Sequence, residues 1–191
     1  MSEPRGTTVG RPDETPSWQD LLTERLRDAY DTRQIIDAIE GSGETDMDAR
    51  EVLDMMASDP VLRSAIAFAD SVAILQIVGN ERDEGWVVDD ERSGPIGASV
   101  GVTWRYDAAH NWEPDYDPTK PNAELRSLAP TGRNLEAHGF SMFGVEDEAF
   151  QVRRHIDWAG LYAQLGLGLN WRIPVDEVPV LRRPPDAEAS D

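Results

Sequence analysis

The chain contains no cysteine, a single lysine and three histidines among its 191 residues. Without cysteine it cannot form disulfides, thiolate metal sites or a thiol nucleophile. The sequence also lacks a glycine-rich phosphate loop and the H-E-x-x-H and G-x-S-x-G motifs, so the best-known nucleotide, zinc-protease and serine-hydrolase chemistries have no signature in it. The spacing of the three histidines fits no common metal pattern. We therefore expect neither a cofactor nor a metal.

Long apolar runs are absent as well. No stretch approaches the roughly 20 apolar residues that cross a membrane, and residues 1–16 lack the apolar region of a signal peptide. Acidic residues number 37 against 18 basic ones, which gives a net charge of −19. Because such a surface repels phosphate, we expect neither nucleic acid nor an anionic membrane as a partner. These features predict a cytoplasmic protein.

The length fits one domain of ordinary size with tails at both ends. Residues 1–16 and 182–191 are rich in glycine, proline and charge, and hold too few apolar residues to order themselves. We expect both segments to be disordered tails that are dispensable for folding, and residues 17–181 to form the domain.

The first part of the domain carries helical patterns. Apolar residues recur at helical spacing between Ser17, a candidate N-cap, and Gly41. A second helix is predicted from near Thr45, and a third from Pro60, since proline suits the first helical position. Residues 74–78 fit either the end of that helix or a strand.

From Gly85 onward the pattern changes to the alternation of strands. Strands are predicted at 86–88, 97–106, 133–145 and 149–158, followed by a short helix at 159–167. The Pro/Asp/Asn-rich stretch 107–131 is predicted to be a long loop. Helices followed by a mainly antiparallel sheet indicate an α+β fold.

The most informative segment is 150–158. Its even positions are apolar except for Arg154, while its odd positions are all polar. The period of two places the odd residues on one face, and these are Gln151, Arg153, His155 and Asp157. That face either meets water or lines a polar cavity in which an acid–base reaction takes place. In the second case the apolar even face would pack against another subunit, which predicts a homodimer.

Three segments resemble the SnoaL-like polyketide cyclase family, which belongs to the NTF2-like (ketosteroid isomerase-like) superfamily. They read P-T-G-R at 130–133, G-F-S-M-F-G-V-E-D at 139–147 and I-D-W-A-G-L-Y-A-Q-L-G at 156–166. The family ends in a similar order of a T-G-R turn, a strand, an acidic turn, a strand and a D-W-x-G-L segment. The resemblance extends weakly back to Ala98, and residues 1–95 do not match.

This resemblance implies an NTF2-like cone, in which N-terminal helices pack on a curved sheet around one largely apolar pocket. It implies a cofactor-free intramolecular aldol closure in which Asp157 removes a proton α to a carbonyl. His155 and Arg153 are expected to tune that carboxylate. The family's usual histidine on the preceding strand corresponds to Phe143 here, and His155 or His138 would have to replace it.

The resemblance also implies a substrate that is a small, largely apolar metabolite, with polyketides and terpenoids among the classes considered. The residues expected to bind it are Trp104, Tyr106, His110, His138, Phe143 and Ser141. Cyclisation, isomerisation, hydrolysis and dehydration remain open, and the alternative is a non-catalytic NTF2-like ligand-binding or scaffold protein. An open cavity that reaches Asp157 would favour an enzyme, whereas a cone filled by Trp104 or Phe143 would favour a scaffold.

Three further patterns have alternative interpretations. Residues 105–107 read Arg-Tyr-Asp, which is similar to the Arg-x-Asp pair of related epoxide hydrolases. Asp157 is also a candidate N-cap for a helix that begins at Trp158. Asp115 and Asp117 resemble calcium ligands, but the twelve-residue pattern of a calcium loop is missing, and a solvated turn is the expected structure.

Overall fold

The structure is a computed structural model that describes five stretches of the chain, namely residues 16–27, 29–43, 45–75, 80–111 and 128–166. The predicted tails, 1–16 and 182–191, lie outside these stretches apart from Pro16. Asp115 and Asp117 lie outside them as well. The expectations for these segments therefore remain predictions.

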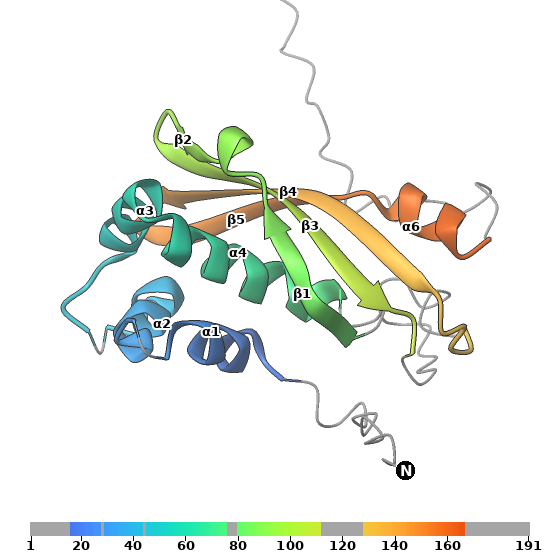
Figure 1. Cartoon of the computed structure of the whole chain (residues 1–191). Coiled ribbons are helices and arrows are strands. Elements are labelled where there is room, and N and C mark those ends of the chain that lie inside the picture. Colours follow the sequence, from blue (N-terminus) through green and yellow to red (C-terminus); the bar gives the residue numbers. More distant parts are fainter. Residues whose placement is uncertain (1–15, 28, 44, 76–79, 112–127, 167–191) are drawn as a thin grey trace, which may run out of the picture.

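Within the described residues, helices come first and an antiparallel sheet follows (Figure 1). The helices are α1 (Trp18–Leu26), α2 (Thr32–Glu40), α3 (Ala49–Ser58), α4 (Pro60–Leu75) and α6 (Trp158–Gln164). The strands are β1 (Asn80–Val88), β2 (Gly94–Ile96), β3 (Ser99–Ala109), β4 (Asn134–Glu146) and β5 (Ala149–Ile156), with a 3-10 turn, η2 (Asp90–Arg92), before β2. The α+β prediction is confirmed.

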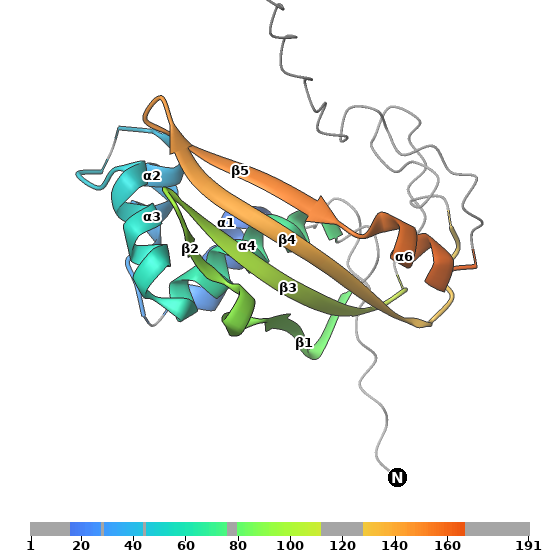
Figure 2. The same ribbon diagram turned by 90° about the horizontal axis from the view of Figure 1, so that it is seen from above.

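The sheet has the order β1-β3-β4-β5, and β2 pairs with β3 beside β1. All of these pairings are antiparallel. The long strands β3 and β4 twist along their length, and the sheet curves over the helices (Figure 2). Helix α4 runs beneath the concave face, with α1 on its far side (Figure 1). Helices packed on a curved antiparallel sheet are the arrangement expected of an NTF2-like cone.

The helix predicted between Ser17 and Gly41 is in fact two helices, α1 and α2. Its start is as predicted, because Ser17 and Asp20 form a reciprocal capping box. The break between the helices coincides with a contact to a distant residue. The hydroxyl of Tyr30 donates a hydrogen bond to the carboxylate of Asp59, directly before α4. This bond fixes the connection between α1 and α2 to the start of another helix.

Asp59 therefore has two structural roles. Its Oδ1 accepts hydrogen bonds from the backbone N–H groups of Val61 at 2.8 Å and Leu62 at 3.2 Å, which satisfies the free donors at the start of α4. The hydrogen bond from Tyr30 holds the pKa of Asp59 below its usual value. Pro60 occupies the first position of α4, as predicted.

Helix α3 begins later than the predicted start near Thr45. Asp48 is its N-cap and forms a capping box with Glu51, with bonds of 2.8 Å and 3.0 Å. The hydroxyl of Thr45 instead accepts from the backbone N–H of Met47 and shapes the preceding turn. Of the ambiguous residues 74–78, the first two belong to α4 and the others lie outside the described residues.

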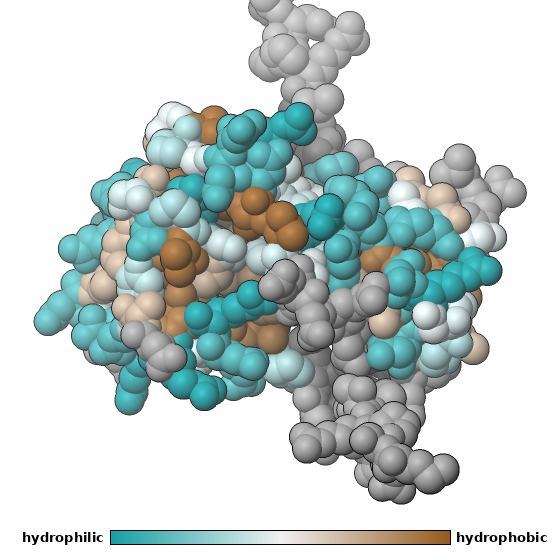
Figure 3. Space-filling model, viewed as in Figure 1, coloured by the Kyte–Doolittle hydropathy of each residue, from teal (hydrophilic) through white to brown (hydrophobic). Residues whose placement is uncertain are grey.

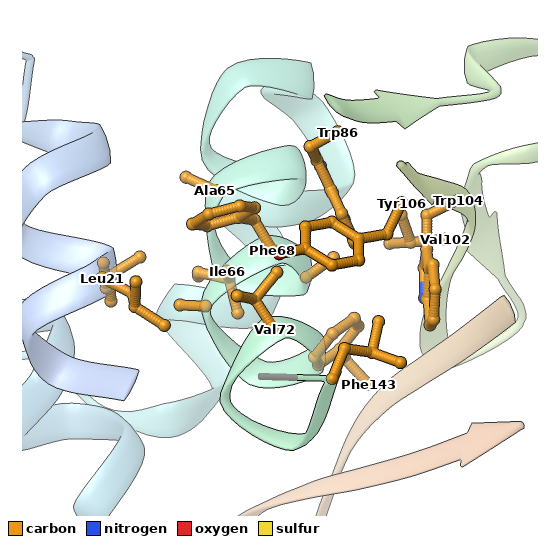
Figure 4. Packing of buried hydrophobic residues seen from close by; sticks show 14 of the residues in the cluster. Leu21, Ala65, Ile66, Phe68, Val72, Trp86, Val102, Trp104, Tyr106 and Phe143 are labelled. Atoms are coloured by element: carbon orange, nitrogen blue, oxygen red, sulfur yellow. The ribbon is translucent and has the colours of Figure 1, made fainter. Parts of the chain in front are cut away.

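The core lies between α4 and the concave face of the sheet (Figure 4). Trp86 of β1 stacks on Trp104 of β3 with ring centroids 5.2 Å apart, and Phe68 of α4 meets Trp86 edge-on at 5.5 Å. Val72 of α4 and Tyr106 of β3 join the same cluster. Stacked and edge-to-face aromatic pairs add to the stabilisation from apolar burial. This cluster holds the helical layer on the sheet.

Gly139 leaves room for the largest side chain of this core. It lies directly opposite Trp104 in the register of β3 and β4. The indole ring of Trp104 crosses the place where a Cβ atom at position 139 would stand. A glycine within a strand commonly marks such a close approach. The side chain of Trp104 can lie flat against the sheet only because residue 139 has no side chain.

We predict that Gly139→Ala destabilises the fold by about 1–3 kcal/mol, the usual cost of overpacking a core. Gly144→Ala on the same strand is the matched control, because the nearest atom to its added methyl group would be Ser99 Oγ at 3.3 Å. Urea unfolding of both variants measures the difference. Equal losses in the two variants would contradict this role of Gly139.

Candidate functional site

The predicted catalytic residues lie on the outer face of the sheet. The side chains of Arg153 and His155 are exposed, and Arg153 forms an ion pair of 3.8 Å with Glu146. The alternation predicted for β5 is therefore correct, but among the described residues its polar face is exposed and lines none of the cavities given below. The apolar even face, which includes Val152 and Ile156, packs against helices of the same chain. The apolar even face therefore does not need a second subunit to cover it. The homodimer stays a prediction.

Asp157 is the N-cap of α6. Its Oδ1 accepts the backbone N–H of Gly160 at 2.9 Å, and its own N–H donates to the carbonyl of His138 at 2.9 Å. A Cβ atom at position 160 would collide with the carboxylate, so Gly160 makes room for the cap. The capping interpretation is confirmed. A base is most effective in a dry site, whereas Asp157 is exposed, and its catalytic role stays a prediction.

Most of the predicted substrate-binding residues lie on the opposite, inner face of the sheet. Five are buried, with exposures of 2% or less: Trp104, Tyr106, His110, Ser141 and Phe143. The sixth, His138, is exposed on the outer face, where it contacts Glu136 at 2.7 Å. The sheet thus separates five of the six predicted binding residues from the predicted catalytic ones, because neighbouring positions of a strand point to opposite sides.

The inner face around Trp104 is packed core. The indole Nε1 of Trp104 donates to Ser141 Oγ at 3.0 Å, and Ser141 Oγ lies 3.4 Å from Ser71 Oγ of α4. All three residues are buried. The hydroxyl of Ser141 gives the indole N–H a partner inside the core, and Ser71 in turn gives Ser141 one. Trp104 therefore fills the cone at this level, which is the arrangement that the sequence analysis associated with a scaffold protein.

His110 fastens the turn that follows the long loop. Its Nδ1 accepts the backbone N–H of Thr131 at 3.2 Å and lies 3.0 Å from the hydroxyl of the same residue. Backbone hydrogen bonds join it to Gly132 and Arg133. Burial lowers the pKa of His110, so its imidazole is neutral at pH 7 with the proton on Nε2. This histidine holds the T-G-R turn in place.

The Arg-Tyr-Asp triplet does not form an inward-facing site. Arg105 and Asp107 project from the outer face and contact each other at 3.4 Å, while Tyr106 points into the core. A second contact of 3.6 Å joins Arg105 to Glu136. Both side chains are partly buried, at 43% and 33% exposure, and Arg105 Nε and Asp107 Oδ1 are buried atoms. A hydrolase role for this outward-facing pair stays a prediction.

The best candidate for a binding site is an apolar cavity between α1, α2, α4 and the inner face of β4 and β5. Its volume is about 260 Å³. Its apolar walls are formed by Trp18, Ile39, Ile66, Phe143, Phe150 and Val152. The cavity also contains a charged pair, Asp70 of α4 and Arg154 of β5. Among the predicted binding residues, Phe143 is the one that lines it.

The pair is joined by two hydrogen bonds. Arg154 donates from Nε to one carboxylate oxygen of Asp70 at 2.6 Å and from Nη2 to the other at 2.7 Å. The side chain of Asp70 is 17% exposed and that of Arg154 is 34% exposed. Arg154 is the one polar residue among the even positions of 150–158, and the alternation alone predicts no role for it. Its partner could not be identified from a pattern within one strand.

Two wider grooves are more polar or more open. One, of about 710 Å³, lies between the α2–α3 connection and the β4–β5 turn and is rich in carboxylates and backbone. The other, of about 390 Å³, lies between α1, α4 and β1. In the part of the chain that the structure describes, no cluster of three potential metal ligands occurs, and no helix has the length and apolarity of a membrane span. On the face seen in Figure 3, hydrophobic residues form separate patches among hydrophilic ones.

Comparisons with known proteins place the chain near two solved structures. No protein-family profile and no curated protein matches it. A structure described as a putative polyketide cyclase from Acidithiobacillus ferrooxidans matches 53% of this chain and 62% of its own length, with 17% identity and a TM-score of 0.34. TsrD from Streptomyces laurentii matches 53% of this chain and 66% of its own, with 17% identity and a TM-score of 0.33. The chain thus spans less than two thirds of either protein, and the fold assignment rests on its own strand order and helices.

We predict that Asp157→Ala lowers the free energy of unfolding by about 1 kcal/mol, the usual loss when an N-cap is removed. Asp157→Asn should be close to neutral, because an asparagine oxygen can accept the same bond from Gly160. Chemical unfolding of the two variants measures the difference. An asparagine variant as unstable as the alanine variant would argue against the cap as the main role of this side chain.

Proposed function

We propose that this protein binds a small, largely apolar molecule in the cavity between α1, α2, α4 and β5. The observation that carries the proposal is the single charged pair of Asp70 and Arg154 within walls that are otherwise apolar. Small-molecule sites typically combine apolar walls with a few polar groups that fix the orientation of the ligand. Stability alone does not account for two charges at this place, since replacing a buried ion pair by apolar residues often leaves the free energy of unfolding unchanged.

The volume of the cavity matches a small ligand. About 260 Å³ equals the space of roughly nine water molecules at about 30 Å³ each. A ligand with about ten non-hydrogen atoms fits this space, and a larger one would extend out of its open side. The proposed ligand is therefore a short-chain or single-ring compound. Its affinity would come mainly from apolar burial, worth about 25 cal/mol per Å² of surface removed from water.

A cofactor-free acid–base reaction is the second candidate function. It is favoured by one observation, the carboxylate of Asp70 beside an apolar cavity, since acid–base catalysis needs a positioned carboxylate in dry surroundings. A cyclisation, isomerisation or hydrolysis in this cavity would use Asp70 in place of Asp157. Mass spectrometry of bound compounds after incubation tests it. If turnover survives in Asp70→Asn but is lost in Asp157→Asn, the catalytic base is Asp157 and not Asp70.

We predict that Val152→Trp blocks the cavity and weakens binding of a small apolar probe, 1-octanol, by tenfold or more. Val152 forms part of the cavity wall, so the larger indole ring would extend into the cavity and fill it. Val87→Trp is the matched control, because Val87 is a strand valine that is 42% exposed and lies away from the cavity. Calorimetric titration gives the two affinities. Equal binding by the parent and Val152→Trp would refute the proposed site.

A further inference from the structure

The charges of Asp70 and Arg154 stand out because each interrupts an apolar pattern. Asp70 follows Ile66 by one helical turn on the buried side of α4, and Arg154 lies between Val152 and Ile156 on the inner face of β5. Either charge alone would be expensive to hold against an apolar wall. Together they balance, and the planar guanidinium matches the carboxylate through two parallel hydrogen bonds.

This balance determines which ligand charges the cavity tolerates. A carboxylate that approached Arg154 would meet the oxygens of Asp70, which already lie 2.6 Å and 2.7 Å from the same guanidinium. An ammonium group that approached Asp70 would meet the guanidinium in turn. The partly buried position strengthens both repulsions, because water screens them less than at the surface. The net charge of −19 adds to the repulsion of anions but attracts cations, so the exclusion of amines depends on the guanidinium of Arg154.

A neutral polar group meets neither repulsion. Each carboxylate oxygen can accept more than one hydrogen bond, so a ligand hydroxyl can donate to Asp70 while the bonds from Arg154 remain. Resting on the binding site proposed above, we infer that the Asp70–Arg154 pair selects neutral ligands with one hydroxyl group on a short hydrocarbon body. The same pair excludes carboxylic acids and amines of similar size.

Three probes of equal chain length test this selectivity at pH 7, namely 1-octanol, octanoate and octylammonium. Calorimetric titration of the parent protein should show 1-octanol binding at least tenfold more tightly than either ion. Asp70→Asn removes the carboxylate that faces Arg154 across the two hydrogen bonds and should improve octanoate binding by at least tenfold. Arg154→Gln should do the same for octylammonium.

Asp54→Asn is the matched control for the change in net charge, because Asp54 is exposed on α3 and does not line the cavity. It should leave all three affinities unchanged. The double variant Asp70→Asn with Arg154→Gln has no charge in the cavity and serves where a single variant fails to fold. It should keep the preference for 1-octanol over both ions.

The two proposals fail in different ways. If 1-octanol does not bind to the parent, or binds equally to Val152→Trp, the cavity is not the ligand site and the proposed function is wrong. If 1-octanol binds in the cavity but octanoate or octylammonium binds the parent equally well, the selectivity is wrong while the site stands. An unchanged preference in a folded Asp70→Asn protein would also overturn the role of the pair.

Discussion

The whole structure depends on covering one face of a strongly alternating sheet. The strands carry apolar residues on a single side, and these must leave water for the sheet to be stable. The contact of Phe68 with Trp86, and of Trp86 with Trp104, joins α4 to that side. Behind α4, α1 packs on α4, while α2 packs on α1 and α3 and against β5. The cavity lies where these elements meet.

The covering of the sheet also explains why the candidate chemistry is found where it is. A reacting group needs dry surroundings, and in this fold the inner side of the sheet is the dry one. Most of that side is filled, since Trp104 lies flat over Gly139 and bonds to Ser141. Space remains beside Phe143, and the charged pair lies there. The polar residues of the outer face stay in water and form surface ion pairs.

Local patterns predicted much of the fold. The capping residues Ser17 and Asp20, the Asp59–Pro60 boundary and the alternation in residues 97–106 are signals that lie within a few positions of one another, and the structure contains each of the corresponding elements. The break between α1 and α2 was not predicted in this way, and it coincides with a bond from Tyr30 to a residue 29 positions away, which no local pattern shows.

The same limit applies to the site. Alternation shows that a strand has two faces, but it does not show which face another element covers, so the polar face of β5 was open to two interpretations. Arg154 was visible as an irregularity, yet its meaning depends on Asp70, which is 84 positions away in the sequence. Conversely, the aspartate of the D-W-x-G-L segment fits two roles equally well from sequence alone. Asp157 could be the base that the family resemblance implies or the N-cap of the helix that follows. Composition and spacing cannot separate these roles without the third dimension.

The tight turn between β4 and β5 has a consequence for how the sheet can misassemble. Its central residues, Asp147 and Glu148, both have positive φ angles of 51° and 66°, which side chains other than glycine adopt at a cost of about 1–2 kcal/mol each. The turn sets the pairing of Glu146 with Ala149. A slip of one residue would exchange the faces of β5 and place the positions of Arg153 and His155 against the helices. A two-residue turn with both central residues at positive φ matches the twist of the strands that it joins, so it favours this register over misregistered pairings during folding in spite of the local cost.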